Sequence, residues 1–355
     1  MKKLSLIFSM VFAAGMAMAQ TNQSVINASG KDQIATVDQQ GGYNTSNVTQ
    51  SNKDNVTTVT QVNHLLVAGN SILSNVTQSG ERNDATVSQI HDGSNPNQVG
   101  LIETVITQAG NDNEAIQNQG DNSNTGLLYA SINQSGDDNF ASQNQMKYRN
   151  SAYIDQSGKN NTAMQAQDAS LLLEEEETSH YASINQSGDN NYAEQVQNGH
   201  SNTAIAVQSG NGNDSWQTQN AWKSVASVNQ SESGKNNEAT QTQNGALNKA
   251  TITQASNGNI AIQIQTGGAR RPGNADYAEN NLAEIHQWGG NENEAYQTQT
   301  TPGDGADENY AGAWQNGSGN LATQTQVGGF NYSTVSQTGS GHEATLTQSM
   351  SITQP

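Results

Sequence analysis

Polar and apolar residues alternate along most of the chain in short stretches that recur at a fixed spacing. Residues 186–208 hold the phrase Q-x-G-x-x-N-x-A-x-x-x-Q twice, and the Gln that closes one copy opens the next. The repeat is therefore 11 residues long. The first copy consists of Gln186, Gly188, Asn191, Ala193 and Gln197, and the second of Gln197, Gly199, Asn202, Ala204 and Gln208.

Each copy predicts one turn followed by one strand. Gly and Asn tolerate the backbone conformations of tight turns, so G-x-x-N marks a bend. The residues after it alternate with period two, which places Ala193, Gln195 and Gln197 on one face of a strand. Two copies form strand-turn-strand-turn, which we call a rung. Stacked rungs predict an all-β fold, a two-sheeted β-solenoid with parallel, in-register strands.

The two strands of a rung differ in their middle inward position. One type has the pattern Ala-x-Ile/Val-x-Gln and the other has Ala-x-Gln-x-Gln; examples are Ala182-Ile184-Gln186 and Ala239-Gln241-Gln243. From Ala115 to Val335 the types alternate, with Ala206 and Ala313 in place of the branched residue, so a 22-residue period lies above the shorter one. In-register stacking then predicts one sheet of each type.

The motif predicts stacked side-chain amides inside the solenoid. Parallel strands about 4.8 Å apart bring each Gln over its counterpart, so amide O and N pair along the stack. Each bond contributes about 0.5–1.5 kcal/mol, and a buried amide left unpaired costs about 1–3 kcal/mol. The inward Gln and Asn and the turn Gly that we expect to carry self-assembly are Gln108, Gly110, Asn113, Gln119, Gln134, Gly136, Asn139, Gln145, Gln156, Gly158, Asn161, Gln167, Gln186, Gly188, Asn191, Gln197, Gly199, Asn202, Gln208, Gly210, Asn213, Gln219, Gln315, Gly317, Asn320, Gln326 and Gln337.

The regularity of the pattern divides the chain. Residues 20–61 are degenerate opening repeats in which both strand types carry Val, residues 62–348 are the main solenoid, and residues 349–355 are a tail. The spacing is longer before six motif Gln residues: Gln78, Gln108, Gln134, Gln186, Gln287 and Gln315. All six belong to strands of the Ala-x-Ile/Val type or its Ala313 equivalent, so we expect the insertions to lie along one edge.

Residues 1–19 have the form of a secretory signal peptide. Lys2 and Lys3 precede an apolar run, and Ala17-Met18-Ala19 is a small-x-small cleavage site. The apolar run is too short to span a bilayer. We therefore expect an exported chain with no membrane span.

The motif resembles the curlin repeat, the unit of curli-type amyloid fibres on bacterial surfaces. Two copies that carry the resemblance are Gln108-Gly110-Asn113-Ala115-Gln119 and Gln315-Gly317-Asn320-Ala322-Gln326. It covers roughly Ala28 to Gln348, with many more repeats than the usual curli subunit and several insertions. The resemblance implies an extracellular fibre subunit whose partners are further copies of itself and curli-type export and nucleation proteins.

Composition excludes several other classes. There is no Cys, hence no disulfide framework. The net charge of −19 is the reverse of what a nucleic-acid binder needs. Only 32% of the residues are hydrophobic, which usually indicates disorder, but a disordered tract need not keep Ala and Gln in register.

Candidate metal and catalytic groups are weak. Glu174–Glu177 with His180 is interpreted as a charged edge loop, and Gly303–Asp307 has the wrong spacing for a calcium loop. The six His residues form no metalloprotease motif, and His200 and His342 are expected in solvated turns. We expect no metal, no cofactor and no enzyme activity.

The motif continues to Gln348, so both ends are expected to present open strand edges, which template another chain. Head-to-tail addition does not close and gives a filament. The sequence predicts a secreted structural subunit of a cell-surface fibre for biofilm matrix and adhesion. The alternatives are a minor or nucleating subunit, a monomeric solenoid that binds carbohydrate or ice, and a disordered matrix polymer. The ice or carbohydrate alternative needs a flat outward row such as T-x-T, and no regular one is found.

Overall fold

The computed structural model describes residues 22–64, 71–91, 100–120, 127–147, 149–169, 179–231, 234–267, 281–301 and 308–349. Within these ranges every helix or strand element is a β-strand. The chain divides into two compact units, unit 1 (Met1–His180) and unit 2 (Tyr181–Pro355), and each is described by itself. The predicted signal peptide lies outside the described residues, and the predicted division at residues 61 and 62 stays a prediction.

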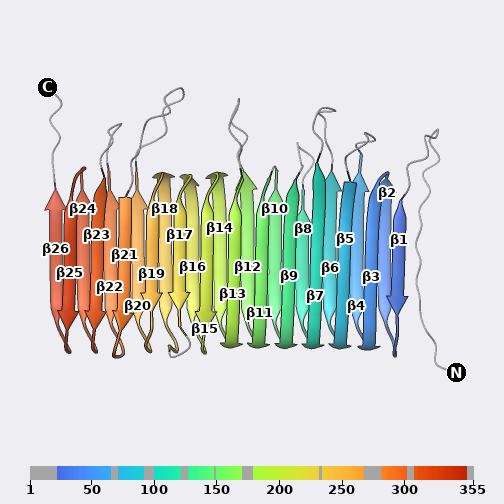
Figure 1. Ribbon diagram of the computed structural model, residues 1–355, viewed down its shortest axis with the longest axis horizontal. Coiled ribbons are helices and arrows are strands. Elements are labelled where there is room, and N and C mark those ends of the chain that lie inside the picture. Colours follow the sequence, from blue (N-terminus) through green and yellow to red (C-terminus); the bar gives the residue numbers. More distant parts are fainter. Residues whose placement is uncertain are drawn as a thin grey trace. The chain divides into compact units, whose positions relative to one another are not determined.

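Unit 1 contains two sheets whose strands alternate along the chain (Figure 1). One sheet holds the odd-numbered strands β1 (Gln23–Ala28), β3 (Asn44–Lys53), β5 (Ser71–Glu81), β7 (Leu101–Asn111), β9 (Leu128–Asp137) and β11 (Ser151–Lys159). The other holds the even-numbered strands β2 (Ile34–Gly41), β4 (Val56–Asn63), β6 (Asp84–His91), β8 (Glu114–Gln119), β10 (Phe140–Met146) and β12 (Thr162–Ala169).

Unit 2 is built in the same way. Its odd sheet holds β13 (Tyr181–Asp189), β15 (Thr203–Ser209), β17 (Val225–Gln230), β19 (Lys249–Gln254), β21 (Asn281–Trp288), β23 (Asn309–Asn316) and β25 (Tyr332–Thr338). Its even sheet holds β14 (Tyr192–His200), β16 (Asp214–Trp222), β18 (Glu238–Ala246), β20 (Ile260–Thr266), β22 (Glu294–Thr300), β24 (Leu321–Val327) and β26 (Glu343–Ser349).

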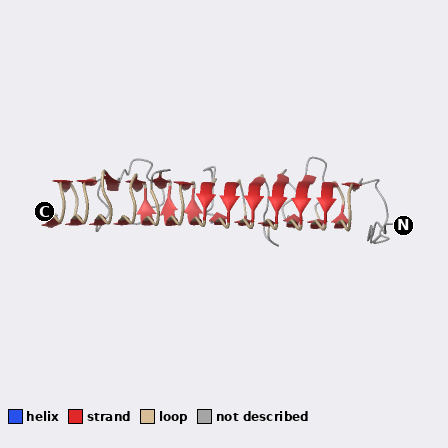
Figure 2. Cartoon of the chain, turned by 90° about the horizontal axis from the view of Figure 1, so that it is seen from below, coloured by secondary structure: helices blue, strands red, loops and turns tan. Residues whose placement is uncertain are grey.

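All strand pairs are parallel and pair motif position with motif position. Between β9 and β11, for example, Ala152 lies on Ala130 and Gln156 on Gln134. Within each unit the two sheets form two layers, joined by turns at their edges (Figure 2). The structure therefore confirms the predicted two-sheeted β-solenoid, with strands mostly of the Ala-x-Ile/Val type in the odd sheet and, from β8 to β24, strands of the Ala-x-Gln type in the even sheet.

Each unit has two edges with different connections (Figure 1). An odd strand leads to the next even strand through a short turn at one edge, which we call the turn edge. An even strand leads to the next odd strand at the opposite edge, the insertion edge. The inserted residues lie outside the described ranges, but the strands on either side keep register: Gln254 of β19 pairs with Gln287 of β21.

The apolar core is thin and lies between the two sheets. Ile or Val from the odd strands packs against Ala from the even strands, as Ile252 and Ile285 do with Ala261 and Ala295. All four side chains are fully buried. Each strand has three inward positions, which we call the first, middle and last slot; in most strands the first holds Ala and the last holds Gln.

Candidate assembly interface

Buried Gln side chains form continuous ladders along each unit. In unit 1, Nε2 of Gln108 donates to Oε1 of Gln134 at 2.9 Å, and Gln134 donates to Gln156 at 3.0 Å. In unit 2 the same column runs from Gln186 through Gln208 to Gln337, and the last slot of the even strands forms a second column that ends at Gln348. Wherever two of these Gln residues are bonded, the Gln of the preceding rung is therefore the donor and the Gln of the following rung the acceptor.

The Gln amides also tie the two sheets together. Nε2 of Gln134 lies 2.9 Å from the carbonyl oxygen of Glu114, which belongs to the facing sheet, and 3.0 Å from that of Asn139. The same pattern recurs in unit 2, where Gln315 reaches the carbonyls of Glu294 and Asn320. The Gln ladders therefore replace much of the apolar contact that usually holds two sheets together.

The motif Asn residues form ladders of opposite direction at the turn edge. The backbone N–H and Nδ2 of Asn113 both donate to Oδ1 of Asn83 in the preceding rung, at 3.1 and 3.0 Å. Asn139 repeats this on Asn113, and in unit 2 Asn320 repeats it on Asn293. Within these ladders a bonded Gln oxygen thus accepts from the preceding rung, whereas a bonded Asn oxygen accepts from the following one.

The predicted Gly and Asn have different roles in the turn. All the predicted turn Gly residues have positive φ, for example +104° at Gly110 and +124° at Gly317. The second positive φ lies at the residue before the motif Asn, such as Asp112 (+55°) or Asn190 (+59°). The motif Asn itself is buried and bonded. The sequence located the bend correctly, but the conformational freedom of Asn is used one residue earlier.

The structure places every predicted Gln and Asn in a buried ladder position and every predicted Gly in a turn; their role in self-assembly stays a prediction. The buried amides are Gln108, Asn113, Gln119, Gln134, Asn139, Gln145, Gln156, Asn161, Gln167, Gln186, Asn191, Gln197, Asn202, Gln208, Asn213, Gln219, Gln315, Asn320, Gln326 and Gln337. The Gly residues are Gly110, Gly136, Gly158, Gly188, Gly199, Gly210 and Gly317.

Amide oxygens are left without a partner where a slot changes its kind between neighbouring rungs. The middle slot of the even strands holds Val87 in β6 and Gln117 in β8, and Oε1 of Gln117 is buried without a hydrogen bond. Oε1 of Gln50 is likewise unpartnered, because its counterpart in β1 is Ala28. Stacking like on like is therefore the condition that satisfies these buried amides.

Sequence reasoning missed one buried column at the insertion edge of unit 1. Ile72, Ile102 and Leu128 occupy the slot of the motif Asn and form a separate apolar cluster. Oδ1 of Asn44, which pairs with Ile72, is left unpartnered. The signal was present in the sequence, because each of the three lies six residues before a motif Gln.

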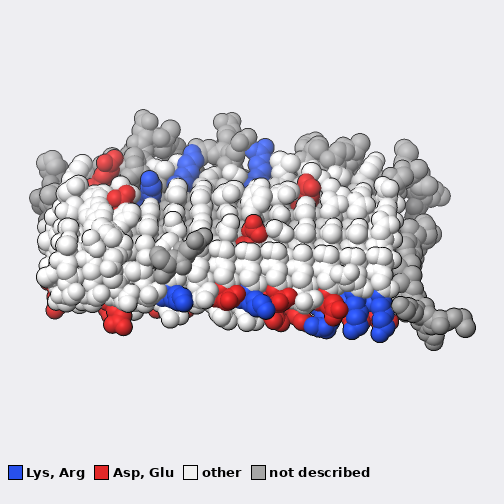
Figure 3. All heavy atoms as spheres, turned by 60° about the horizontal axis from the view of Figure 1, so that its bottom comes forward, with Lys and Arg blue, Asp and Glu red and all other residues white. Residues whose placement is uncertain are grey.

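The charged side chains of unit 1 gather at its turns. Figure 3 shows Lys, Arg, Asp and Glu along one edge below a face that carries few of them. Arg82 binds Asp112 of the next rung through Nε–Oδ1 (2.6 Å) and Nη2–Oδ2 (2.5 Å), and this bond lowers the pKa of Asp112. Lys159 lies 3.2 Å from Asp137 and likewise lowers the pKa of that carboxyl. These turn charges pair across rungs and leave the ladders uncharged.

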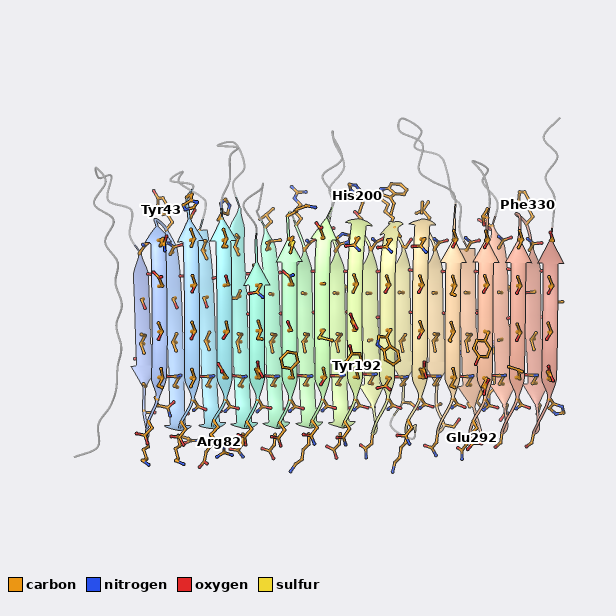
Figure 4. The ribbon with its side chains drawn as sticks, turned by 180° about the vertical axis from the view of Figure 1, so that it is seen from behind. Tyr43, Arg82, Tyr192, His200, Glu292 and Phe330 are labelled. Atoms are coloured by element: carbon orange, nitrogen blue, oxygen red, sulfur yellow. The ribbon has the colours of Figure 1, made fainter. Side chains whose placement is uncertain are left out.

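The outer faces carry paired aromatic and acidic side chains. The rings of Tyr192 and Trp216 lie tilted against each other with centroids 5.6 Å apart, and the Tyr192 hydroxyl donates to Glu194 at 2.8 Å. Burial, followed by that hydrogen bond, raises the pKa of Tyr192 to about 12. Burial also raises the pKa of Asp84 and of Asp214. Figure 4 shows Tyr192 on the face of its strand, away from the turns.

The slots that are buried in interior strands become accessible in two of the four end strands of the described sheets, β1 and β26. Within the described residues β26 pairs only with β24, and its slot residues Ala344, Leu346 and Gln348 are partly exposed. At the other end β1 pairs only with β3 and has the same pattern. The equivalent Ala and Gln in interior strands are buried almost completely. Within the described residues β1 and β26 therefore each offer an unpaired backbone edge and an incomplete core, whereas the slots of the end strands β2 and β25 are buried apart from that of Gln39.

The histidines differ in part from expectation. His342 is exposed in a turn as predicted, but His200 is 6% exposed, so the expectation of a solvated turn is wrong there. His200 lies at the insertion edge (Figure 4), and in the strand register it is opposite Trp222 of the next rung. His180 is also buried, while Glu174–Glu177 and Gly303–Asp307 lie outside the described residues.

No group of His, Asp and Glu suited to a metal ion occurs among the described residues. A search of the same residues finds no helix with the length and apolarity to cross a membrane.

The repeated rungs and the buried amide ladders define a repeat protein of the parallel, two-sheeted β-solenoid class. Residues 320–349, which run from Asn320 through β24 and β25 to the end of β26, match the family model of the curlin associated repeat. The chain therefore contains a curlin repeat, in agreement with the resemblance found in its motif. A search of curated proteins finds no match for the chain.

Proposed function

We propose that this chain is a secreted structural subunit that assembles end to end into curli-type amyloid fibres, which serve as biofilm matrix and in adhesion. The observation that carries the proposal is the contrast between interior and terminal strands. The slots buried in interior strands are partly exposed in β1 and β26, each of which has one unpaired edge within the described residues. A free strand edge recruits a further strand.

The curlin repeat at residues 320–349 supports the same proposal, because it includes the terminal strands β25 and β26. Leu346 of β26 is partly buried against the core of unit 2. A further strand on β26 would remove it from water. Burial of a Leu side chain contributes about 1.5–3 kcal/mol when complete, so strand addition is favoured by the core as well as by backbone hydrogen bonds.

The test is growth of the chain without residues 1–19 from purified monomer, followed by thioflavin fluorescence and fibre diffraction. We expect fibres with the reflection near 4.7–4.8 Å of stacked strands. Leu346→Lys should slow growth strongly, because it places a charge in the contact between copies. Thr347→Lys is the matched control, since Thr347 is exposed on the outer face of the same strand. A chain that stays monomeric at all concentrations overturns the proposal and favours a monomeric solenoid.

A further inference from the structure

The amide ladders give the two ends of the chain different chemistry. At the end formed by β25 and β26, Gln348 accepts from Gln326, and its Nε2 reaches only the carbonyl of Tyr332. At the end formed by β1 and β2, Gln39 donates to Gln61 at 2.8 Å, and no donor among the described residues reaches its Oε1. One end therefore presents a Gln donor and the other a Gln acceptor.

The Asn ladder at the insertion edge has the opposite polarity. Asn331 donates to Asn309 of the preceding rung, and no donor among the described residues reaches its own Oδ1. At the other end Asn22 accepts from Asn44 through Oδ1, and its backbone N–H makes no hydrogen bond with a described residue. Both ladders thus end with complementary groups at opposite ends of the chain.

The middle slot of the even strands adds an apolar match. It holds Val37, Val59 and Val87 in the first three even strands, Gln from β8 to β24, and Leu346 in β26. A like-on-like stack is therefore interrupted at Leu346 and resumes only with the Val residues at the other end of the chain. The Asn column of the turn edge has a different residue at each end. Gln33, which is buried and whose amide atoms have no partner, takes the place of Asn in the first rung, and His342 takes it in the last.

We infer that the joint between two copies seats β1 on β25 and β2 on β26, so that Leu346 packs on Val37 of the next copy and Gln348 donates to its Gln39. This inference rests on the proposed function and specifies its partner, a second copy in one orientation and register. The first slots then pair Ala344 with Ala35, and Asn331 receives the N–H of Asn22. Gln337 then lies on Ala28, and this costs no hydrogen bond, because Nε2 of Gln337 already bonds the carbonyls of Leu321 and His342 at 2.8 and 2.9 Å.

Other joints satisfy fewer of these groups. Because strands alternate between the sheets, seating β1 on β26 leaves the edge of β25 without a partner. A joint between two β25–β26 ends opposes Gln donor to Gln donor. The turns fit the inferred joint as well, since Gly30 and Asp32 (φ +107° and +54°) adopt the conformation of Gly339 and Gly341 (+114° and +70°).

Crosslinking inside fibres tests the joint, because the chain has no Cys of its own. Thr345 and Thr36 face outward at the positions that the joint stacks, about 4.8 Å apart. We mix chains carrying Thr345→Cys with chains carrying Thr36→Cys, grow fibres and apply a short thiol-reactive crosslinker. Val25→Cys is the matched partner for the joint with β1 on β26, and Thr345→Cys alone reports the joint between like ends.

We expect the dimer of the Thr345→Cys and Thr36→Cys chains as the main product, with the other pairs at the level found in unassembled protein. As a second measurement, the double variant T345K/T36K should grow severalfold more slowly than T345K/T36E, because only the second places opposite charges across the joint. Fibres in which Thr345→Cys links to Val25→Cys or to itself overturn the joint and leave the proposed function intact. Absence of any fibre overturns both.

Discussion

Unit 1 and unit 2 carry the same buried slots on different turns. At the turn edge of unit 1 the two residues before the slot of the motif Asn are mostly charged: Lys31-Asp32, Lys53-Asp54, Glu81-Arg82, Asn111-Asp112, Asp137-Asp138 and Lys159-Asn160. In unit 2 they are mostly neutral: Asp189-Asn190, Asn211-Gly212, Lys235-Asn236, Asn257-Gly258, Asn291-Glu292, Ser318-Gly319 and Ser340-Gly341. The turn tips also bond from rung to rung, as Asn111 does with Oδ1 of Asp137 at 3.1 Å and Lys235 with Oδ1 of Asn257 at 2.9 Å, but these bonds lie outside the buried Gln and Asn ladders.

The units also differ in how completely their ladders are satisfied. At the insertion edge of unit 2 the Asn column continues through Asn248, Asn281, Asn309 and Asn331. In unit 1 the corresponding column is interrupted by Ile72, Ile102 and Leu128. The interruption is tolerated because the three apolar residues stack on one another, and its cost falls on the single oxygen of Asn44. In a buried column it therefore matters more that residues of neighbouring rungs are of the same kind than that they are amides.

The largest expected effect tests whether the turn requires Gly equally strongly in unit 1 and in unit 2. Gly110→Ala in unit 1 and Gly317→Ala in unit 2 each place a Cβ against the carbonyl oxygen of the next rung's Gly, at φ values that L residues rarely adopt. We expect each to lower the free energy of unfolding by at least about 2 kcal/mol. The measurement is the urea midpoint of the folded chain at unchanged m-value.

The matched control lies in the same turn. Gly319 has φ +64° and open space around its Cβ position, and Asp112 holds the equivalent position in unit 1 at +55°. Gly319→Ala should therefore cost only about 1 kcal/mol. An equal loss at Gly317 and Gly319 would show that backbone strain alone matters and that the close approach of rungs does not.

The second expected effect compares the middle of a ladder with its boundary. Gln217→Val in unit 2 removes the bonds with Gln195 and Gln241, at 2.7 and 2.9 Å, and leaves a buried oxygen on Gln241. Gln117→Val in unit 1 removes one ladder bond, to Gln143, together with a bond to the carbonyl of Val105, and eliminates an oxygen that already has no partner. We expect Gln217→Val to destabilise the chain by about 1–2 kcal/mol more than Gln117→Val.

A third variant tests whether the effect depends on the position of the Gln within its ladder or on the unit that contains it. Gln143→Val lies in unit 1 but within the ladder, between Gln117 and Gln165. It should behave like Gln217→Val when urea midpoints are compared. If it behaves like Gln117→Val instead, the ladders of unit 1 are weaker throughout, and the boundary explanation is wrong.

Much of this arrangement could be predicted from the sequence, because in-register stacking imposes equal spacing on every residue that must meet its like. The position of Gln254 on Gln287 follows from the motif although the insertion before Gln287 is long. The single insertion edge follows from the same alternation. Regular spacing therefore carries the register, the sheet assignment and the buried face.

The direction of the ladders could not be predicted in this way. Whether Gln134 donates forward or backward depends on the backbone carbonyls that its Nε2 also reaches, and these come from Glu114 of the facing sheet. The burial of His200 could not be predicted either, because its counterpart in the next rung, Trp222, lies outside the motif. The apolar column of Ile72 was missed because a search for Gln, Gly and Asn passes over the positions where the motif residue is replaced.

The smallest expected effect concerns acid and distinguishes the turns of the two units. Bonds from Arg82 and Lys159 lower the pKa of Asp112 and Asp137 in folded unit 1. A carboxyl with a lowered folded pKa contributes stability above its unfolded pKa, about 3.9, and loses it as the pH falls through the folded value. Acid below about pH 4 should therefore loosen the turns of unit 1 more than the neutral turns of unit 2.

Hydrogen exchange measured by mass spectrometry, corrected for intrinsic rates, checks this on peptides that contain the turns. Asp84 in unit 1 and Asp214 in unit 2 have raised pKa values, so each favours the folded state below its unfolded pKa and loses this contribution as the pH rises through the folded value. Because each unit holds one such group, the difference between the units isolates the turn pairs. Asp137→Asn should abolish the acid response around Lys159 and leave that around Arg82, whereas an unchanged response in this variant would assign the acid sensitivity to groups outside the turns.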